Sequence, residues 1–174
     1  ICFNALHGPF GEDGKIQKIL KKNNFSFTHS NYTSSANCFN KLKSKKIVKK
    51  FKIKTPSFEI VKCENINLKL LNKIKKKFSK FVLKPVSSGS SHGLKIIKSN
   101  KDLSIFFEEL RNFKKRFHKS EQFIIEKYIS GKELTVSVLE KNSIPQPLEV
   151  TEIVSLNETY DYQAKYSKGF SKHF

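Results

Sequence analysis

The sequence predicts a mixed α/β fold. Segments with helical periodicity alternate with short apolar runs that are typical of strands along most of the chain. A hydrophobic content of 37% in 174 residues is enough for a buried core. Glycine is scarce, and six of the seven glycines fall in three short motifs, which indicates positions that need positive φ or a close approach.

Amphipathic spacing predicts the helices. The segment 68–78 has apolar residues at 68, 71, 74 and 78, which places them on one face of a helix. The segment 102–117 has the same character. Three shorter helices are expected over 15–23, over 41–51, and through Phe39 with Ser34 as the cap.

Short runs of β-branched and aromatic residues predict the strands. Residues 81–84 and 94–98 enclose a Gly/Ser-rich loop over 86–93, which predicts a hairpin with a small-residue tip. The segment 156–174 has no period and is expected to be a long polar loop that carries aromatic residues. The other expected strands are 1–6 (the end of a buried strand), 26–28, 57–62, 122–128, 133–140 and 147–154.

The formal net charge of +19 raises the question of an anionic partner. Only Arg111 and Arg116 among the 34 basic residues are arginine, whereas base-edge and bidentate phosphate contacts favour arginine. We therefore interpret the lysines as a compositional bias and expect no specific nucleic acid partner, with binding to polyanions as an alternative. No apolar stretch approaches the roughly 20 residues that span a bilayer, so no membrane association is expected.

The cysteines and the chain ends indicate the setting of the protein. Cys2, Cys38 and Cys63 are odd in number and lack C-x-x-C spacing, so we expect neither a disulfide framework nor a zinc site. A reducing cytoplasm fits this pattern. The chain opens on an apolar run and contains no methionine, so we expect a piece of a longer protein.

The loop 84–93 is the first motif with chemical content. Lys84 ends a strand, and the following Gly/Ser loop offers backbone N–H groups and hydroxyls that can hold a phosphate. The motif matches neither the G-x-x-x-x-G-K-[ST] phosphate loop nor the dinucleotide G-x-G-x-x-G pattern. A mobile turn without function is the alternative.

Two further motifs contain candidate binding groups. Glu126 and Glu133 stand on either side of a turn, where carboxylates can accept hydrogen bonds from an amino group or from ribose hydroxyls. Taken alone, they are better explained as exposed acidic residues paired with surplus lysines. The segment 160–166 carries tyrosines and Lys165 in a loop that can close over a small polar substrate. Surface tyrosines in a loop are also ordinary.

The order of these motifs resembles that of the D-alanine–D-alanine ligases of the ATP-grasp superfamily, over essentially the whole chain. The motifs that carry the resemblance are Asn4-Ala5-Leu6-His7-Gly8 with Gly11-Glu12-Asp13-Gly14, Lys41, Lys84-Pro85 with Gly89-Ser90-Ser91-x-Gly93, Glu126-Lys127 with Ser130-Gly131-x-Glu133, and Tyr160-Asp161-Tyr162-x-Ala164-Lys165-Tyr166. The resemblance implies a partial ATP-grasp fold. Residues 1–39 would end the N-terminal Rossmann-like substrate domain, 40–127 would form the central subdomain, and 128–174 would begin the C-terminal subdomain.

The resemblance also implies roles for individual residues. Lys41 and Lys84 would contact the nucleotide phosphates, and the loop Gly89-Ser90-Ser91 would fold over them. Adenine would be held by Glu126, the backbone of Lys127 and Ile129, and ribose by Glu133. The residues expected at the reacting groups are Ser90, Lys165 near the γ-phosphate, Tyr166 over the substrate, and His7 near the D-alanine site.

The implied reaction is ATP-dependent ligation of two D-alanines through an acyl phosphate, for peptidoglycan precursors. The family also uses Mg²⁺ or Mn²⁺, whose ligands are expected outside this segment, so the segment alone should be inactive. Asn40, Tyr128 and the turn Pro9-Phe10 depart from the family pattern without touching the core of the mechanism. The alternatives are another ATP-grasp carboxylate–amine ligase and a decayed gene product. The family is commonly dimeric, which leaves a homodimer open.

Overall fold

The computed structural model describes residues 1–155 and 171–174. They form two compact units, Ile1–Tyr128 and Ile129–Phe174. The domain limits expected from the sequence, at 39/40 and 127/128, stay a prediction. Within the described residues no helix is both long enough and apolar enough to cross a membrane.

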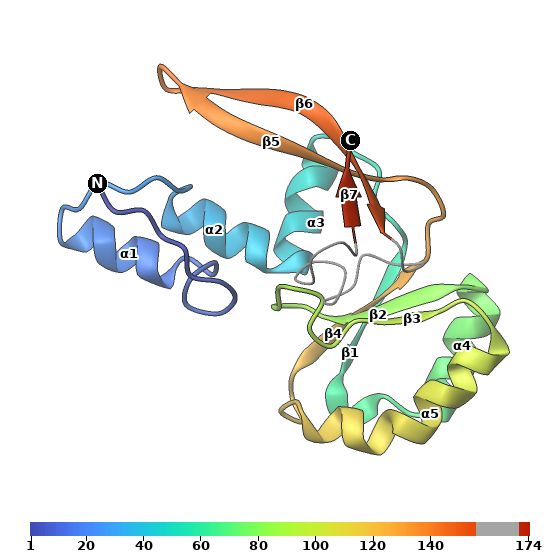
Figure 1. Ribbon diagram of the computed structural model, residues 1–174. Helices are drawn as coiled ribbons and strands as arrows, with labels where there is room; N and C mark the ends of the chain where they lie inside the picture. Colours follow the sequence, from blue (N-terminus) through green and yellow to red (C-terminus); the bar gives the residue numbers. More distant parts are fainter. Residues whose placement is uncertain (156–170) are drawn as a thin grey trace. The chain divides into compact units, whose positions relative to one another are not determined.

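The first unit is built around an antiparallel sheet of four strands in the order β1-β4-β2-β3 (Figure 1). Its strands are β1 (Phe58–Lys62), β2 (Phe81–Pro85), β3 (Lys95–Ile97) and β4 (Gln122–Lys127). Phe81 of β2 lies opposite Ile97 of β3, so the hairpin predicted around the 86–93 loop is confirmed. A 3-10 turn, η1 (Cys63–Asn65), follows β1.

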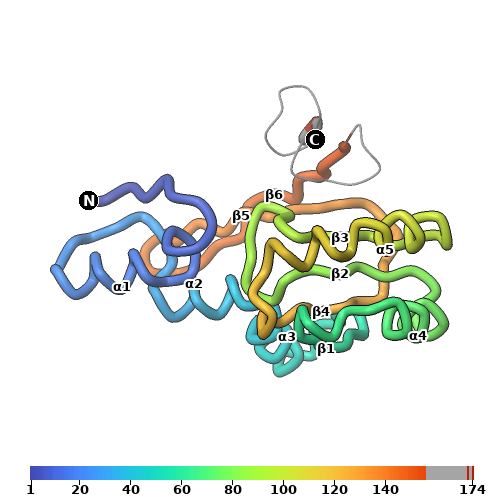
Figure 2. The backbone as a smooth tube through the Cα atoms, turned by 90° about the horizontal axis from the view of Figure 1, so that it is seen from below, coloured from blue at the N-terminus to red at the C-terminus, as the bar shows by residue number. Residues whose placement is uncertain are grey.

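Two helices, α4 (Leu68–Phe78) and α5 (Asn100–Lys115), lie along one face of this sheet (Figures 1 and 2). Side chains alternate between the two faces of a strand, so every second residue of β2 and β4 points toward these helices. The core comprises Phe81, Leu83, Phe123 and Ile125 from the strands and Leu71, Ile74, Phe106 and Phe113 from the helices. The side chains of Lys84 and Glu126 therefore point to the opposite face of the sheet.

Helix α5 begins earlier than its predicted start at residue 102, because a capping box forms at Ser99. The Ser99 Oγ accepts a hydrogen bond from the Asp102 backbone N–H at 3.1 Å. The Asp102 carboxylate accepts one from the Ser99 N–H at 2.7 Å. This reciprocal pair satisfies two N–H groups that a helix start otherwise leaves without partners.

The N-terminal part of the first unit contains α1 (Lys15–Lys22), α2 (Tyr32–Phe39) and α3 (Lys41–Lys50). The predicted cap of α2, Ser34, is wrong. Asn31 has the extended backbone of a cap, and its side chain accepts a hydrogen bond from the Ser34 N–H at 2.9 Å. Ser34 is therefore the third residue of the helix.

The buried strand predicted over 1–6 is also wrong. The segment forms one isolated parallel bridge, between Cys2 and Phe27, and the predicted strand over 26–28 is reduced to the same bridge. Ile1 and Phe3 are largely exposed. An apolar run is buried as a strand only where neighbouring elements cover it, and the described residues supply a single bridge.

The second unit is an antiparallel sheet in the order β5-β6-β7, with β5 (Glu133–Lys141), β6 (Ile144–Ser155) and β7 (Ser171–His173). Asn142 and Ser143 both have positive φ, as the tight turn between β5 and β6 requires. The strands predicted on either side of Ser130-Gly131 thus belong to different sheets. Strand β7 corrects the loop prediction for residues 171–173, and residues 156–170 of that loop lie outside the described residues.

Neighbouring phenylalanines of α5 offer a test of this packing. Phe106 is 2% exposed in the core, whereas Phe107 is 43% exposed. Phe106→Ala should lower the free energy of unfolding by about 3–5 kcal/mol, because it leaves a cavity in the core. Phe107→Ala should cost less than about 1 kcal/mol. Urea-induced unfolding of both variants measures the difference, and equal losses would contradict the assigned orientation of α5.

Candidate functional site

The sheet face opposite α4 and α5 carries an ion pair between adjacent strands. Lys84 lies across from Ile124 and Val82 across from Glu126, so Lys84 and Glu126 are diagonal neighbours on one face. The Lys84 ammonium forms an ion pair with Oε2 of Glu126. Two residues expected at the nucleotide site are thereby brought into contact.

A second lysine, Lys45 of α3, completes this cluster. Its ammonium lies 2.6 Å from Oε1 of Glu126, so each carboxylate oxygen has its own cation. The same ammonium donates to the Pro56 carbonyl at 3.0 Å. Sequence reasoning missed Lys45, although it follows Lys41 by four residues and so lies one helical turn away.

The environment of Glu126 keeps its carboxyl group charged. The residue is only 6% exposed. Burial by itself raises the pKa of Glu126, but the hydrogen bonds and charges of Lys45 and Lys84 outweigh it and hold the pKa below its ordinary value. The carboxylate is therefore an ionised acceptor at neutral pH, already engaged by two lysines.

Lys41 connects the start of α3 to the loop that follows β2. Its backbone N–H donates to the Val86 carbonyl at 3.0 Å. Its ammonium donates to the Ser88 carbonyl at 2.6 Å. The preceding residue, Asn40, forms an isolated bridge with Ser87. Lys41 and the first half of the Gly/Ser loop are consequently held together.

The tip of this loop has an unusual backbone. Ser90 and Ser91 both have positive φ, 48° and 58°, a conformation that side chains with Cβ adopt at some cost. At Gly93, with φ of 71°, an added Cβ would lie 2.6 Å from Cζ of Phe117. At Gly89, an added Cβ would lie 2.9 Å from Oε2 of Glu12. The expectation of positive φ or a close approach is confirmed at Gly93, whereas at Gly89 the near atom is the end of the flexible Glu12 side chain.

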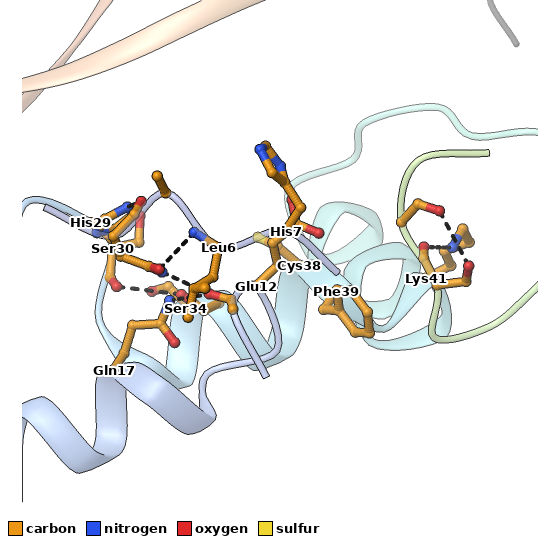
Figure 3. Close-up of a pocket in the computed structure, with 16 residues that line it drawn as sticks. Leu6, His7, Glu12, Gln17, His29, Ser30, Ser34, Cys38, Phe39 and Lys41 are labelled. Carbon is orange, nitrogen blue, oxygen red and sulfur yellow. Dashed lines mark hydrogen bonds between the residues drawn. The ribbon is translucent and has the colours of Figure 1, made fainter. Parts of the chain in front are cut away.

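A pocket of about 630 Å³ joins the loop to the N-terminal motif (Figure 3). His7, Lys41 and Gly89 line it, so three residues expected near substrate or phosphate share one cavity. Glu12 also lines it and accepts a hydrogen bond from the Gly8 N–H at 2.7 Å. Gln17 donates to the Gly11 carbonyl at 2.8 Å. These contacts order the wall of the pocket.

The remaining predicted residues that the structure describes, Lys127, Ile129 and Glu133, are not members of the ion-pair cluster or of the pocket lining. Lys127 ends β4, and its backbone N–H donates to the Ser57 carbonyl at 2.9 Å. Ile129 and Glu133 belong to the second unit and are exposed. Lys165 and Tyr166 lie outside the described residues. The roles given to all these residues stay predictions.

The chain is similar to known ligases in sequence. Residues 47–174 match the sequence model of the family described as "D-ala D-ala ligase C-terminus". The D-alanine–D-alanine ligase of Wolbachia pipientis wMel is 39% identical over 173 residues, which are 99% of this chain and 50% of that protein. The chain thus spans about half the length of the curated relatives that it matches.

Solved structures of ligases are also similar. A Bacillus anthracis D-alanine–D-alanine ligase matches with a TM-score of 0.70 and 32% identity, covering 99% of this chain and 53% of that one. VanG D-Ala:D-Ser ligase from Enterococcus faecalis matches with a TM-score of 0.72 and 28% identity, covering 99% and 48%. The predicted ATP-grasp fold and the resemblance to the D-alanine–D-alanine ligases are confirmed.

Two glycines with the same φ of 71° allow the packing of the loop to be tested. An added Cβ at Gly8 meets nothing within 4 Å, whereas at Gly93 it meets Phe117 and Pro85. Gly8→Ala should cost about 1–2 kcal/mol of unfolding free energy, from backbone strain alone. Gly93→Ala should cost roughly 1–3 kcal/mol more, because of the steric overlap. Urea-induced unfolding measures both, and equal losses would show that Gly93 is not packed as described.

The ion-pair cluster makes stability depend on pH. Because the pKa of Glu126 lies below its ordinary value, its contribution is complete above that ordinary value and is lost as the pH falls through the lowered pKa. Glu126→Gln should therefore destabilise the chain at neutral pH, and its difference from wild type should shrink below about pH 4.

Unfolding titrations between neutral and acidic pH measure this difference. Glu109→Gln is the control, since the Glu109 carboxylate pairs with Lys95 at an exposed position and should contribute under about 1 kcal/mol. A difference for Glu126→Gln that stays constant down to about pH 2 would refute the assignment.

Proposed function

The chain belongs to the D-alanine–D-alanine ligase family, and on this premise we propose that the complete protein joins two D-alanines to D-alanyl-D-alanine with ATP, for peptidoglycan precursors. The activity is proposed for the whole protein because the chain spans about half the length of its relatives. The strongest support in the structure is the contact between Lys84 and Glu126 on the sheet face opposite α4 and α5, where Lys84 stands directly before the Gly/Ser loop.

We propose that ATP lies against this face. Lys84 and Lys41 supply positive charge for the phosphates, and backbone N–H groups and hydroxyls of Gly89, Ser90 and Ser91 fold over them. The adenine is held by Glu126, the backbone of Lys127 and Ile129, and the ribose by Glu133. Two contacts support this proposal. Lys41 is hydrogen-bonded to the Ser88 carbonyl of the loop, and Lys84, which stands directly before the loop, is paired with Glu126.

The proposed reaction has two steps. A carboxylate oxygen of the first D-alanine attacks the γ-phosphorus of ATP, and ADP leaves, which yields an acyl phosphate. The amine of the second D-alanine then attacks the carbonyl carbon, loses a proton, and expels phosphate as the amide bond forms. His7 lies near the first substrate, Ser90 and Tyr166 order it, and Lys165 neutralises charge at the transferred phosphoryl group.

A divalent cation, Mg²⁺ or Mn²⁺, would add further charge neutralisation at the phosphates when bound. The described residues contain no group of three or more His, Cys, Asp or Glu side chains that could hold a metal ion. On the basis of the family resemblance, we propose that its ligands lie elsewhere in the complete protein. We also propose a cytoplasmic location, which the three free thiols support. A homodimer stays a prediction.

The proposal is tested by phosphate release from ATP and Mg²⁺ with the complete protein. Release should depend on D-alanine and be absent with L-alanine or with no amino acid. Lys84→Met should reduce kcat/KM for ATP by at least about 100-fold, because a charge-assisted phosphate contact is lost. D-serine and D-lactate as second substrates test the choice of acceptor, in view of the D-Ala:D-Ser ligase that this chain resembles.

The other outcomes distinguish the alternatives. Release that depends on a different carboxylic acid would retain an ATP-grasp carboxylate–amine ligase and discard the D-alanine substrate. No release with any acid would contradict the proposal. Binding to polyanions that falls steeply with salt, in a protein without ATP turnover, would favour the polyanion alternative.

A further inference from the structure

The two lysines that pair with Glu126 differ in how firmly they are held. The Lys45 side chain is 10% exposed, and its ammonium also donates to the Pro56 carbonyl and lies 4.9 Å from the Phe58 ring centroid. The Lys84 side chain is 28% exposed, and Glu126 is the one ionic partner that the described residues give it. Lys45 is thus anchored by several contacts, whereas Lys84 depends on Glu126.

This difference matters if Lys84 binds a phosphate. An ammonium that approaches a phosphate oxygen gives up at least part of its interaction with Glu126. A buried carboxylate that loses its cations is strongly disfavoured, so the transfer of Lys84 is favourable only if another cation remains beside Glu126. Lys45 already occupies that position, on the other carboxylate oxygen.

We infer that Lys45 is a positioning residue of the nucleotide site, which holds Glu126 in place while Lys84 is transferred to the phosphates of ATP. The inference rests on the proposed function and adds a residue to it. Lys45 contacts Glu126 and the chain segment before β1, and it acts on ATP through Glu126 and Lys84. Without Lys45, Lys84 would be the sole counter-ion of Glu126 and would be retained there.

A purely structural role for Lys45 has different consequences. In that case Lys45 would only join α3 to the sheet, and its removal would lower the free energy of unfolding without a specific effect on ATP affinity. A positioning role predicts weaker ATP binding by the folded protein. It also predicts that this effect depends on the presence of the Glu126 carboxylate.

The test measures ATP binding to the complete protein by calorimetry, with Mg²⁺ and without D-alanine. Lys45→Met should weaken ATP binding roughly tenfold, and KM for ATP should rise similarly while kcat changes by less than about threefold. Lys46→Met is the matched control. Lys46 is the next residue of α3, is exposed, and should leave ATP binding unchanged.

A double variant separates positioning from structure. In the Glu126→Gln background there is no carboxylate to hold, so adding Lys45→Met should weaken ATP binding by less than about twofold. Equal penalties for Lys45→Met with and without Glu126 would overturn the inference. Unchanged ATP binding by folded Lys45→Met would overturn it as well.

Two further measurements keep the test decisive. If Lys45→Met does not fold, Lys45→Gln replaces it, since the amide retains an N–H donor for the Pro56 carbonyl but carries no charge. Lys45→Gln should also weaken ATP binding roughly tenfold, and wild-type affinity would overturn the inference. Wild-type protein that binds no ATP would instead show that the proposed function has failed.

Discussion

The first unit depends on one buried charge, the carboxylate of Glu126. Strand β4 places it on the polar face of the sheet, where Lys84 from β2 and Lys45 from α3 each pair with one oxygen. The cluster therefore joins two strands and a helix that are far apart in sequence. Because a buried carboxylate without cations is costly, the positions of these three elements are coupled. The same coupling places the cationic groups beside the Gly/Ser loop.

Much of this architecture could be predicted from local patterns. The helix over 68–78 is predicted with its observed bounds, since its apolar spacing is regular. Burial that depends on distant partners could not be predicted in this way. Residues 1–6 have the composition of a buried strand, but among the described residues they form a single bridge, to Phe27. Strand β7, with three residues, is too short to show a period.

Sequence motifs predict two residues of the candidate site, Lys84 and Glu126. The third, Lys45, belongs to no motif and is missed. Lys84 directly precedes the Gly/Ser loop, and Glu126 precedes the turn at Ser130-Gly131, so both belong to recognisable sequence motifs. Lys45 stands in a lysine-rich helix, where composition alone suggests a solvated side chain. Its tertiary contacts with Glu126, Pro56 and Phe58 distinguish Lys45, and its spacing of four residues from Lys41 is a weak signal in the sequence.

The Gly/Ser loop is fastened at both ends. Lys41 donates hydrogen bonds to the carbonyls of Val86 and Ser88, through its backbone N–H and its ammonium. Gly93 packs closely against Phe117 and Pro85. Only residues 89–92 lie between these anchors, so the chain from Ser88 to Gly93 spans at most about 17 Å when fully extended. The segment between these anchors is therefore too short to move far from α3 and Phe117 while both anchors hold.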